Sequence, residues 1–278
     1  LDQFRQSMLG DTHIRAIFDY VDSKDCFPTV DISGGVSYFL WDAKHKTNCQ
    51  FTNHFGGNAN TLPRKLDEFN IFVRNNGALS LIHKVKAMSK TMLNAQISPQ
   101  TPFGFVSTYR GTAQPETDPT AVMLKSSGDA SYVLREDIKK NQQWVDLHKV
   151  IFSKATCEHA GTPDRNGQYR VLSALAILQP QCVCTQSYLV AGAYATAEEA
   201  ENLLTYLKTK FVRYLILQTI TSQDLSPEKF MFVPLQDFTS KSDINWSATV
   251  EEIDKQLYEK YGVDEAERSL IENTIKEM

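Results

Sequence analysis

The feature that most constrains the fold is a long amphipathic stretch in the second half of the sequence. Thr196-Ala-Glu-Glu199 has the pattern of a capping box, in which Thr196 and Glu199 satisfy free N–H groups at the start of a helix. Apolar residues then recur at helical spacing over roughly five turns. They are Ala200, Leu203, Leu204, Leu207, Phe211, Tyr214 and Leu215. The pattern predicts one helix over residues 196–220, with this stripe buried and with Lys208, Lys210 and Arg213 outside it.

The width of the stripe indicates what the helix does. Burying a stripe this broad in a core stabilises the protein far more than placing it against a polar DNA groove would. We therefore expect a structural helix that supports the long polar loop 154–170, rather than a recognition helix in the major groove. Loops of that length inside a compact domain are typical of functional or disordered segments.

The rest of the chain predicts a mixed α+β fold. Residues 1–9 have helical spacing before Gly10, and residues 13–20 and 36–41 read as strands, the second entered through Gly34-Gly35. Residues 55–60 read as a loop, and residues 77–92 as a basic helix with Leu79, Ile82, Val85 and Met88 on one face. Short strands are expected at 70–74, 104–108, 121–125, 132–135 and 149–153, and residues 183–190 lead into the helix that begins at Thr196. The end of the chain, 250–278, predicts two amphipathic helices broken at Gly262, with Asp264 as the second N-cap.

The charge distribution matters more than the net charge of −4. Residues 223–278 hold 13 acids and 6 bases, so the rest of the chain is slightly basic. Two stretches, 69–115 and 165–197, contain no acid at all, and they include Arg74, Lys84, Arg165 and Arg170. Such stretches form a positive face that attracts phosphates, unless acids from elsewhere fold back and neutralise them. The sequence leaves both outcomes open.

The sequence lacks the common catalytic motifs. It has no phosphate-binding loop, no Gly-x-Ser-x-Gly elbow and no metalloprotease His-Glu pair. Cys157-x-His159 and Cys182-x-Cys184 do not have the spacing of a zinc knuckle, so core thiols are the preferred interpretation and no metal ligand is assigned. The five scattered cysteines are typical of reduced thiols in a cytoplasmic protein. No apolar run reaches the roughly 20 residues that span a bilayer, so no membrane partner is expected.

Several blocks of sequence resemble one family. The opening Leu1-Asp-Gln-Phe-Arg, with Met8-Leu-Gly-Asp-x-His-Ile-Arg15, is followed by Asp25-Cys-Phe-Pro28 and Gly34-Gly-Val-x-Tyr-Phe-Leu-Trp-Asp42. These residues resemble the end of the methylase domain in TaqI-like and type IIG restriction-modification enzymes. Residues 197–215, Phe232-Val-Pro-Leu-Gln-Asp-Phe238 and Leu257-Tyr-Glu-Lys-Tyr-Gly-Val263 resemble the C-terminal specificity domain of the same enzymes.

The resemblance implies a division into two parts. Residues 1–53 would be the C-terminal remnant of a methyltransferase catalytic domain, ending its sheet. Residues 54–278 would be a mixed DNA target-recognition domain with C-terminal helices. The resemblance also implies a role for Phe27, which stands before Pro28 where these enzymes stack a Phe on the adenine that is rotated out of the duplex. Packing of Phe27 under its own loop is the alternative.

The chain is then expected to be a fragment of an adenine-N6 DNA methyltransferase or restriction enzyme. It has neither the Asn-Pro-Pro-aromatic loop nor the glycine-rich turn that bind the target amine and S-adenosylmethionine. We therefore expect no catalytic residue and no cofactor in this chain, and S-adenosylmethionine only in the intact enzyme. The expected partners are double-stranded DNA and the missing methyltransferase domain, with or without a nuclease domain.

Four basic residues are predicted to contact DNA because they lie in or beside loops of the acid-poor regions. An arginine there can bind guanine O6 and N7 or a phosphate. They are Arg74, Lys154, Arg165 and Arg170. Surface solubility and local ion pairs are the alternative roles.

Two other functions remain open from the sequence. One is a self-contained metal-dependent DNA endonuclease, in which Asp118, Asp129, Glu136 and Asp137 converge on magnesium. The absence of a Glu-x-Lys partner disfavours it. The other is a stand-alone specificity or scaffold subunit, which would have no reason to carry the methylase-like start.

Overall fold

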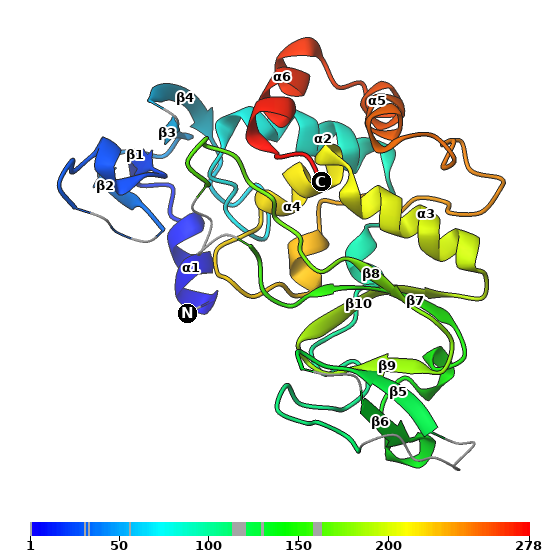
Figure 1. The fold of residues 1–278 in the computed structure, drawn as a ribbon. Coiled ribbons are helices and arrows are strands. Elements are labelled where there is room, and N and C mark those ends of the chain that lie inside the picture. The colour runs from blue at the N-terminus through cyan, green and yellow to red at the C-terminus, as the bar shows by residue number, and fades with distance from the viewer. Residues whose placement is uncertain are drawn as a thin grey trace.

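A computed structural model describes residues 2–30, 32, 34–55, 57–112, 121–128, 131–157 and 163–278. The fold is mixed α+β, as the sequence predicts. Figure 1 shows a four-stranded sheet with helix α1 on one side, a central group of helices, and two small sheets below them.

The first sheet is built by the N-terminal part of the chain. Helix α1 (Asp2–Leu9) leads into β1 (Ile14–Tyr20) and β2 (Val36–Trp41), which confirms the predicted helix and strands. Strands β3 (Cys49–Phe55) and β4 (Asn58–Arg64) complete the order β2-β1-β3-β4. Strand β1 is parallel to β3, and the β1–β2 and β3–β4 pairs are antiparallel.

The β3–β4 hairpin was not predicted, because residues 55–60 read as a loop. The sequence of β4 shows no alternation of apolar and polar residues, since the strand lies at the edge of the sheet with exposed side chains from Asn58 to Pro63. Proline is tolerated on an edge strand because it has no N–H to donate. The sheet continues through Arg64, so it crosses the boundary placed between residues 53 and 54.

The two small sheets pack face to face. One has the order β10-β7-β8, from β7 (His148–Ser153), β8 (Ala176–Leu178) and β10 (Tyr188–Tyr194). The other has the order β6-β5-β9, from β5 (Ala121–Lys125), β6 (Ser131–Leu134) and β9 (Cys182–Cys184).

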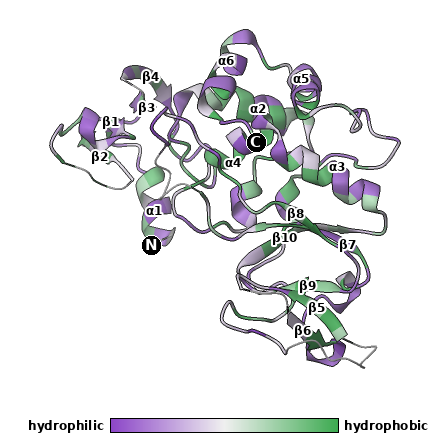
Figure 2. Ribbon diagram, in the orientation of Figure 1, coloured by the Kyte–Doolittle hydropathy of each residue, from purple (hydrophilic) through white to green (hydrophobic). Residues whose placement is uncertain are grey.

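Strand β7 lies between the two cores of the molecule. Because successive side chains on a strand point to opposite faces, Ile151 packs between the sheets, whereas Val150 and Phe152 pack with the helices. The layers are therefore helices, sheet and sheet. Figure 2 shows the apolar residues of these strands in green.

Five helices cover the upper side of the molecule in Figure 1. They are α2 (Leu79–Met88), α3 (Ala197–Lys208), α4 (Lys210–Leu217), α5 (Val250–Lys260) and α6 (Glu265–Thr274). The break at Gly262 and the N-cap at Asp264 are confirmed, since Asp264 accepts a hydrogen bond from the N–H of Glu267. Leu203, Leu207, Phe211 and Leu215 are all fully buried, which confirms the predicted stripe.

The prediction of one helix over residues 196–220 was wrong. The chain is extended at Thr209, which ends α3 and caps α4 by accepting the N–H of Val212. The carboxylate of Asp254, on α5, accepts the N–H groups of Lys210 and Phe211 at 2.9 Å each. The break is stable because the Thr209 hydroxyl and the Asp254 carboxylate accept the N–H groups that are left free at the start of α4.

The position assigned to Arg213 was also wrong. Its side chain was expected outside the buried stripe, but it is 1% exposed. The guanidinium donates to four main-chain carbonyl oxygens, those of Lys208, Thr209, Arg170 and Lys276. A buried cation with several hydrogen-bond acceptors is tolerated where an unpaired one is not.

Three smaller predictions were wrong as well. Residues 70–74 and 104–108 are irregular instead of extended strands. Met88 is 58% exposed, because α2 ends there and Ser89 is extended. These segments contact the core through separate side chains, such as Val73 and Phe105, and not through a regular backbone pattern.

Candidate nucleic-acid interface

The loop between β1 and β2 presents Phe27 to solvent. Its ring is 50% exposed, although the backbone around it is fixed. The N–H of Phe27 donates to Ser23 O at 2.7 Å, and the N–H of Val30 donates to Phe27 O at 3.0 Å. The buried Ser23 hydroxyl donates to Val30 O and accepts the N–H of Ile32. The backbone that carries the half-exposed ring is therefore a defined turn, and the stacking role of Phe27 stays a prediction.

Arg74 fastens this loop to the sheet. Its Nε and Nη2 donate to the carboxylate of Asp19 at 2.9 and 3.0 Å. Its Nη1 donates to Gly34 O at 2.9 Å, at the end of the loop. The Asp19 side chain is 7% exposed and lies on β1. The contact of Arg74 with DNA stays a prediction; in the structure Arg74 connects β1 to the end of the Phe27 loop.

Gly35 makes this attachment sterically possible. It has φ +79°, and a Cβ atom there would lie 2.1 Å from Tyr20 O and 2.7 Å from Val21 O. Those distances are far inside van der Waals contact, so the close approach of the loop to β1 requires glycine. Asp19 and Gly35 were not identified as site residues from the sequence. The sequence did contain a signal for Asp19, because it is an acid inside a strand whose other residues are mostly apolar.

A cleft adjoins this attachment and leads toward a second basic segment. It is lined by Val21 and Arg74 from the N-terminal region, Gln218 next to α4, Thr274 at the end of α6, and Tyr169. Tyr169 belongs to the described part of the predicted 154–170 loop, in which residues 158–162 lie outside the described residues. The cleft thus brings the two predicted DNA-contacting regions to one part of the molecule.

A tight turn presents Arg165. The carboxylate of Asp164 accepts the N–H groups of Asn166 and Gln168 at 2.9 and 3.0 Å, and the N–H of Asp164 donates to Gln168 O. These hydrogen bonds hold the pKa of Asp164 below its usual value, with that from Gln168 the largest cause. Arg165 is exposed within the turn and Arg170 is exposed just after it.

Lys154 is less exposed than Arg165. Its Nζ lies 3.0 Å from the carboxylate of Asp224, and its side chain is partly buried. Its N–H donates to Ser187 O. Part of its positive charge is therefore already offset within the protein, and contact of Lys154 with DNA stays a prediction.

Acids do fold back on the acid-free stretch of sequence. Besides the Arg74–Asp19 pair, Lys84 lies 3.3 Å from the Asp264 carboxylate and 2.6 Å from that of Glu267. Glu267 and Asp264 raise the pKa of Lys84. The stretch 69–115 is therefore a weaker phosphate-attracting face than its sequence indicates, whereas Arg165 and Arg170 of the 163–170 segment are exposed.

The outer face of the first sheet carries stacked aromatic rings. Tyr20 stacks on His54 with ring centroids 4.0 Å apart, and Phe18 stacks on Tyr38 at 5.0 Å. On the edge strand β2, every side chain from Tyr38 to Trp41 is about half exposed. These apolar side chains point to both faces of the sheet, because successive residues of a strand alternate.

The residues proposed for metal chemistry give little support to a nuclease. Glu136 and Asp137 are exposed in a short 3-10 helix, while Asp118 and Asp129 lie outside the described residues. Over the described ranges, no group of His, Cys, Asp and Glu side chains is arranged to hold a metal ion. Cys184 is buried between the small sheets, and burial raises the pKa of its thiol to about 12.

Within the part of the chain that the structure describes, no helix has the length and apolar character needed to cross a membrane.

Comparisons with known proteins find likenesses among solved structures alone. No protein-family model and no curated protein matches the chain. One solved structure that matches is described as the type IIG restriction endonuclease BpuSI, with 10% sequence identity and a TM-score of 0.38. The match covers 99% of this chain and 45% of that protein, so this chain spans less than half of its length.

Proposed function

We propose that this chain recognises duplex DNA for a restriction-modification enzyme that methylates adenine. The observation that carries the proposal is the half-exposed Phe27 ring on a loop fixed by Ser23 and Arg74. An exposed aromatic ring on a backbone turn fixed by hydrogen bonds suits stacking on a base that has left the duplex. The description of BpuSI as a restriction enzyme agrees with the proposal, which does not rest on it.

Arg165 and Arg170 are the proposed DNA contacts in the second basic segment. An exposed guanidinium on a rigid turn binds a phosphate or a guanine edge with less loss of conformational freedom than one on a loose loop. Arg74 and Lys154, which are paired with Asp19 and Asp224, contribute charge near the interface but are bound mainly within the protein. We propose Arg74 as a positioning residue for Phe27 first and as a DNA contact second.

The proposed partner domain is the methyltransferase catalytic domain. Strand β2 supports this, because it is a sheet edge without charged residues whose apolar side chains are half exposed on both faces. Such an edge in a working protein is normally paired or covered. S-adenosylmethionine would be bound by the catalytic domain, and this chain would supply target recognition and Phe27.

A binding titration tests the proposed function. We would measure fluorescence anisotropy of a labelled duplex of mixed sequence at salt concentrations between about 50 and 200 mM. We expect binding that weakens with salt, because phosphate contacts release counterions. Failure to bind any duplex at low salt would contradict the proposal.

Arg165→Ala tests the second basic segment. It should reduce affinity by about 1–3 kcal/mol if Arg165 reads a base, or lower the salt slope by about 1 if it binds a phosphate. The thermal unfolding midpoint should stay unchanged, because Arg165 is exposed. Lys255→Ala is the charge-matched control, since Lys255 is exposed on α5, away from the turn. Equal affinities of the two variants would exclude Arg165 as a DNA contact.

A further inference from the structure

The C-terminal end of the chain runs beside the basic turn. Ile275 and Tyr169 form a parallel β-bridge, in which the N–H of Tyr169 donates to Thr274 O and the N–H of Lys276 donates to Tyr169 O, both at 2.9 Å. The Tyr169 and Ile275 side chains are almost completely buried. The two segments are more than a hundred residues apart in sequence, so the contact depends on the complete fold.

Arg213 joins both segments to α4. Its Nη1 donates to Lys276 O at 2.6 Å and to Arg170 O at 3.3 Å. Because this guanidinium is buried and its Nε is bound to the end of α3, it holds the two carbonyl groups in a fixed position. Arg170 O therefore cannot move without leaving a buried N–H group unsatisfied, which is unfavourable.

Lys276 adds a contact to the base of the turn. Its Nζ lies 3.1 Å from the carboxylate of Asp164. The same carboxylate accepts the N–H groups that shape the turn around Arg165. One residue at the end of the chain thus contacts the 163–170 segment at both Asp164 and Tyr169.

We infer that residues 274–276 form a latch that sets the position of the 163–170 segment and, through it, of Arg165 and Arg170 against DNA. The second half of this inference rests on the proposed function, whereas the first half concerns the protein alone. Lys276 is accordingly a positioning residue, which acts on DNA through the turn.

Two variants separate the contacts of the latch. Lys276→Ala removes the ion pair with Asp164 and keeps the backbone bridge. Lys276→Pro also removes the N–H that donates to Tyr169 O. Met278→Ala is the matched control, because Met278 is partly exposed beyond the latch. A cooperative thermal transition identifies variants that still fold, and if Lys276→Pro does not, Lys276→Ala carries the test.

Trypsin cleavage after Arg165 gives a readout that does not depend on DNA. We expect the cleavage rate to rise at least severalfold in Lys276→Ala, further in Lys276→Pro, and not at all in Met278→Ala. Unchanged cleavage in every folded Lys276 variant would overturn the latch.

The anisotropy titration tests the second half. The Lys276 variants should lose duplex affinity and part of the salt slope, as Arg165→Ala does, while the thermal midpoint of Lys276→Ala stays within a few degrees of that of the unsubstituted chain. Faster cleavage with unchanged affinity would overturn the link between latch and DNA. If the unsubstituted chain binds no duplex, the proposed function fails, and the cleavage rates still decide whether the latch exists.

Discussion

At the scale of single residues, the candidate site depends on the pairing of Arg74 with Asp19. The guanidinium binds a buried carboxylate and a loop carbonyl together, so one side chain connects β1 to the end of the Phe27 loop. Charged hydrogen bonds of this kind are stronger than neutral ones. The exposure of Phe27 is therefore a property of a rigid support and not of a loosely held loop.

Gly35→Ala tests this support. The new Cβ would collide with Tyr20 O, in addition to the backbone strain of a positive φ. Gly34→Ala is the control, because Gly34 also has a positive φ but has nothing within 4 Å of the added Cβ. We expect Gly34→Ala to reduce the free energy of unfolding by about 1–2 kcal/mol, and Gly35→Ala by clearly more. Urea denaturation measures both, and equal losses would show that the loop does not need the close approach.

Asp254 gives the protein a defined pH dependence. Burial raises its pKa from 3.8 to about 6, despite the hydrogen bonds from Phe211 and Lys210. Because the folded pKa is above the unfolded one, the folded state binds a proton that the unfolded state releases. This contribution is fully present below about pH 4 and is lost as the pH rises through 6, by roughly 3 kcal/mol in all.

Asp254→Asn should remove that dependence. We would measure the free energy of unfolding of both proteins by urea denaturation at several pH values. The advantage of the unsubstituted chain over the variant should shrink as the pH rises from 4 to 7. A constant difference across this range would show that Asp254 titrates with an ordinary pKa in the folded protein.

At the scale of elements, the broken α3–α4 pair forms the centre of the helical layer. Phe211 stacks on Tyr261 with ring centroids 5.2 Å apart and is fully buried. Arg213 lies on the same short helix and connects it to the 163–170 segment and to the C-terminal end. The pair is thus a support for the basic segment, in agreement with the structural role predicted from its apolar stripe.

Phe211→Ala should cost about 3–5 kcal/mol of stability, because it leaves a cavity in a closed core. Lys208→Ala, on the last turn of α3, should stay within about 0.5 kcal/mol. Chemical denaturation measures both values. A loss below 1 kcal/mol for Phe211→Ala would show that the α4 core repacks freely around the missing ring.

The elements also show which parts of the fold the sequence can predict. Local patterns sufficed for α1, β1, β2, α5, α6 and the Thr196 cap, because spacing and capping residues determine them. The break at Thr209 depends on Asp254, which is distant in sequence and whose effect no local pattern shows. Strand β4 exists through its pairing with β3 and has no apolar face of its own.

At the scale of the whole molecule, pairing of distant charges limits what the sequence can say about the site. The resemblance implies a stacking role for Phe27 and the sequence predicts a DNA contact for Arg165; both side chains are exposed, and both roles stay predictions. It cannot predict that Asp19 would engage Arg74 or that α6 would neutralise Lys84. These contacts form only after folding, so acid-free sequence does not guarantee a basic surface.

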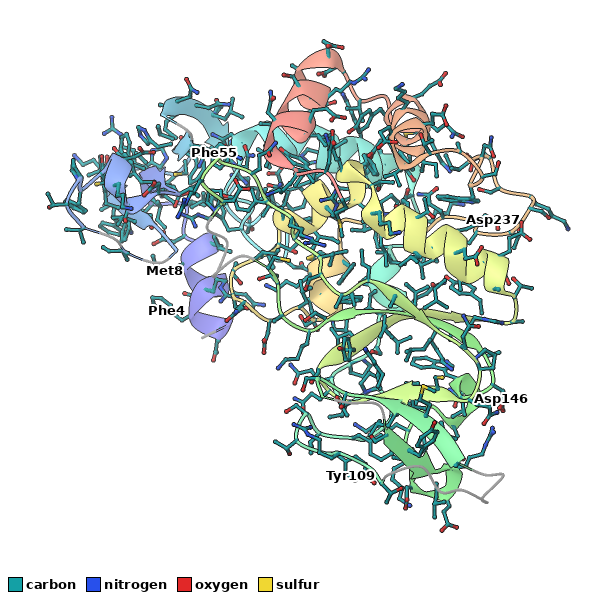
Figure 3. The ribbon with its side chains drawn as sticks, in the orientation of Figure 1. Phe4, Met8, Phe55, Tyr109, Asp146 and Asp237 are labelled. Atoms are coloured by element: carbon teal, nitrogen blue, oxygen red, sulfur yellow. The ribbon has the colours of Figure 1, made fainter. Side chains whose placement is uncertain are left out.

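The spatial arrangement nevertheless brings the candidate groups together. The Phe27 loop is attached through Arg74, and the basic segment through Tyr169, to the two sides of one cleft. The two small sheets, with Tyr109 near the β5–β6 end, lie on one side of α3 and α4, and the helices α5 and α6 lie on the other (Figure 3). The helices α5 and α6, which carry seven of the 33 acids of the chain, thus lie away from those sheets.

The central claim is that Phe27 stacks on an extrahelical base, and photo-cross-linking tests it most directly. A duplex with one unpaired 5-iodouracil would be bound and irradiated, and the attached residue would be identified by mass spectrometry. Our account predicts attachment at Phe27, lost in Phe27→Ala and retained in Phe4→Ala, since Phe4 is 68% exposed but lies on α1. Attachment elsewhere in a fully bound complex, with equal affinity of Phe27→Ala, would contradict it.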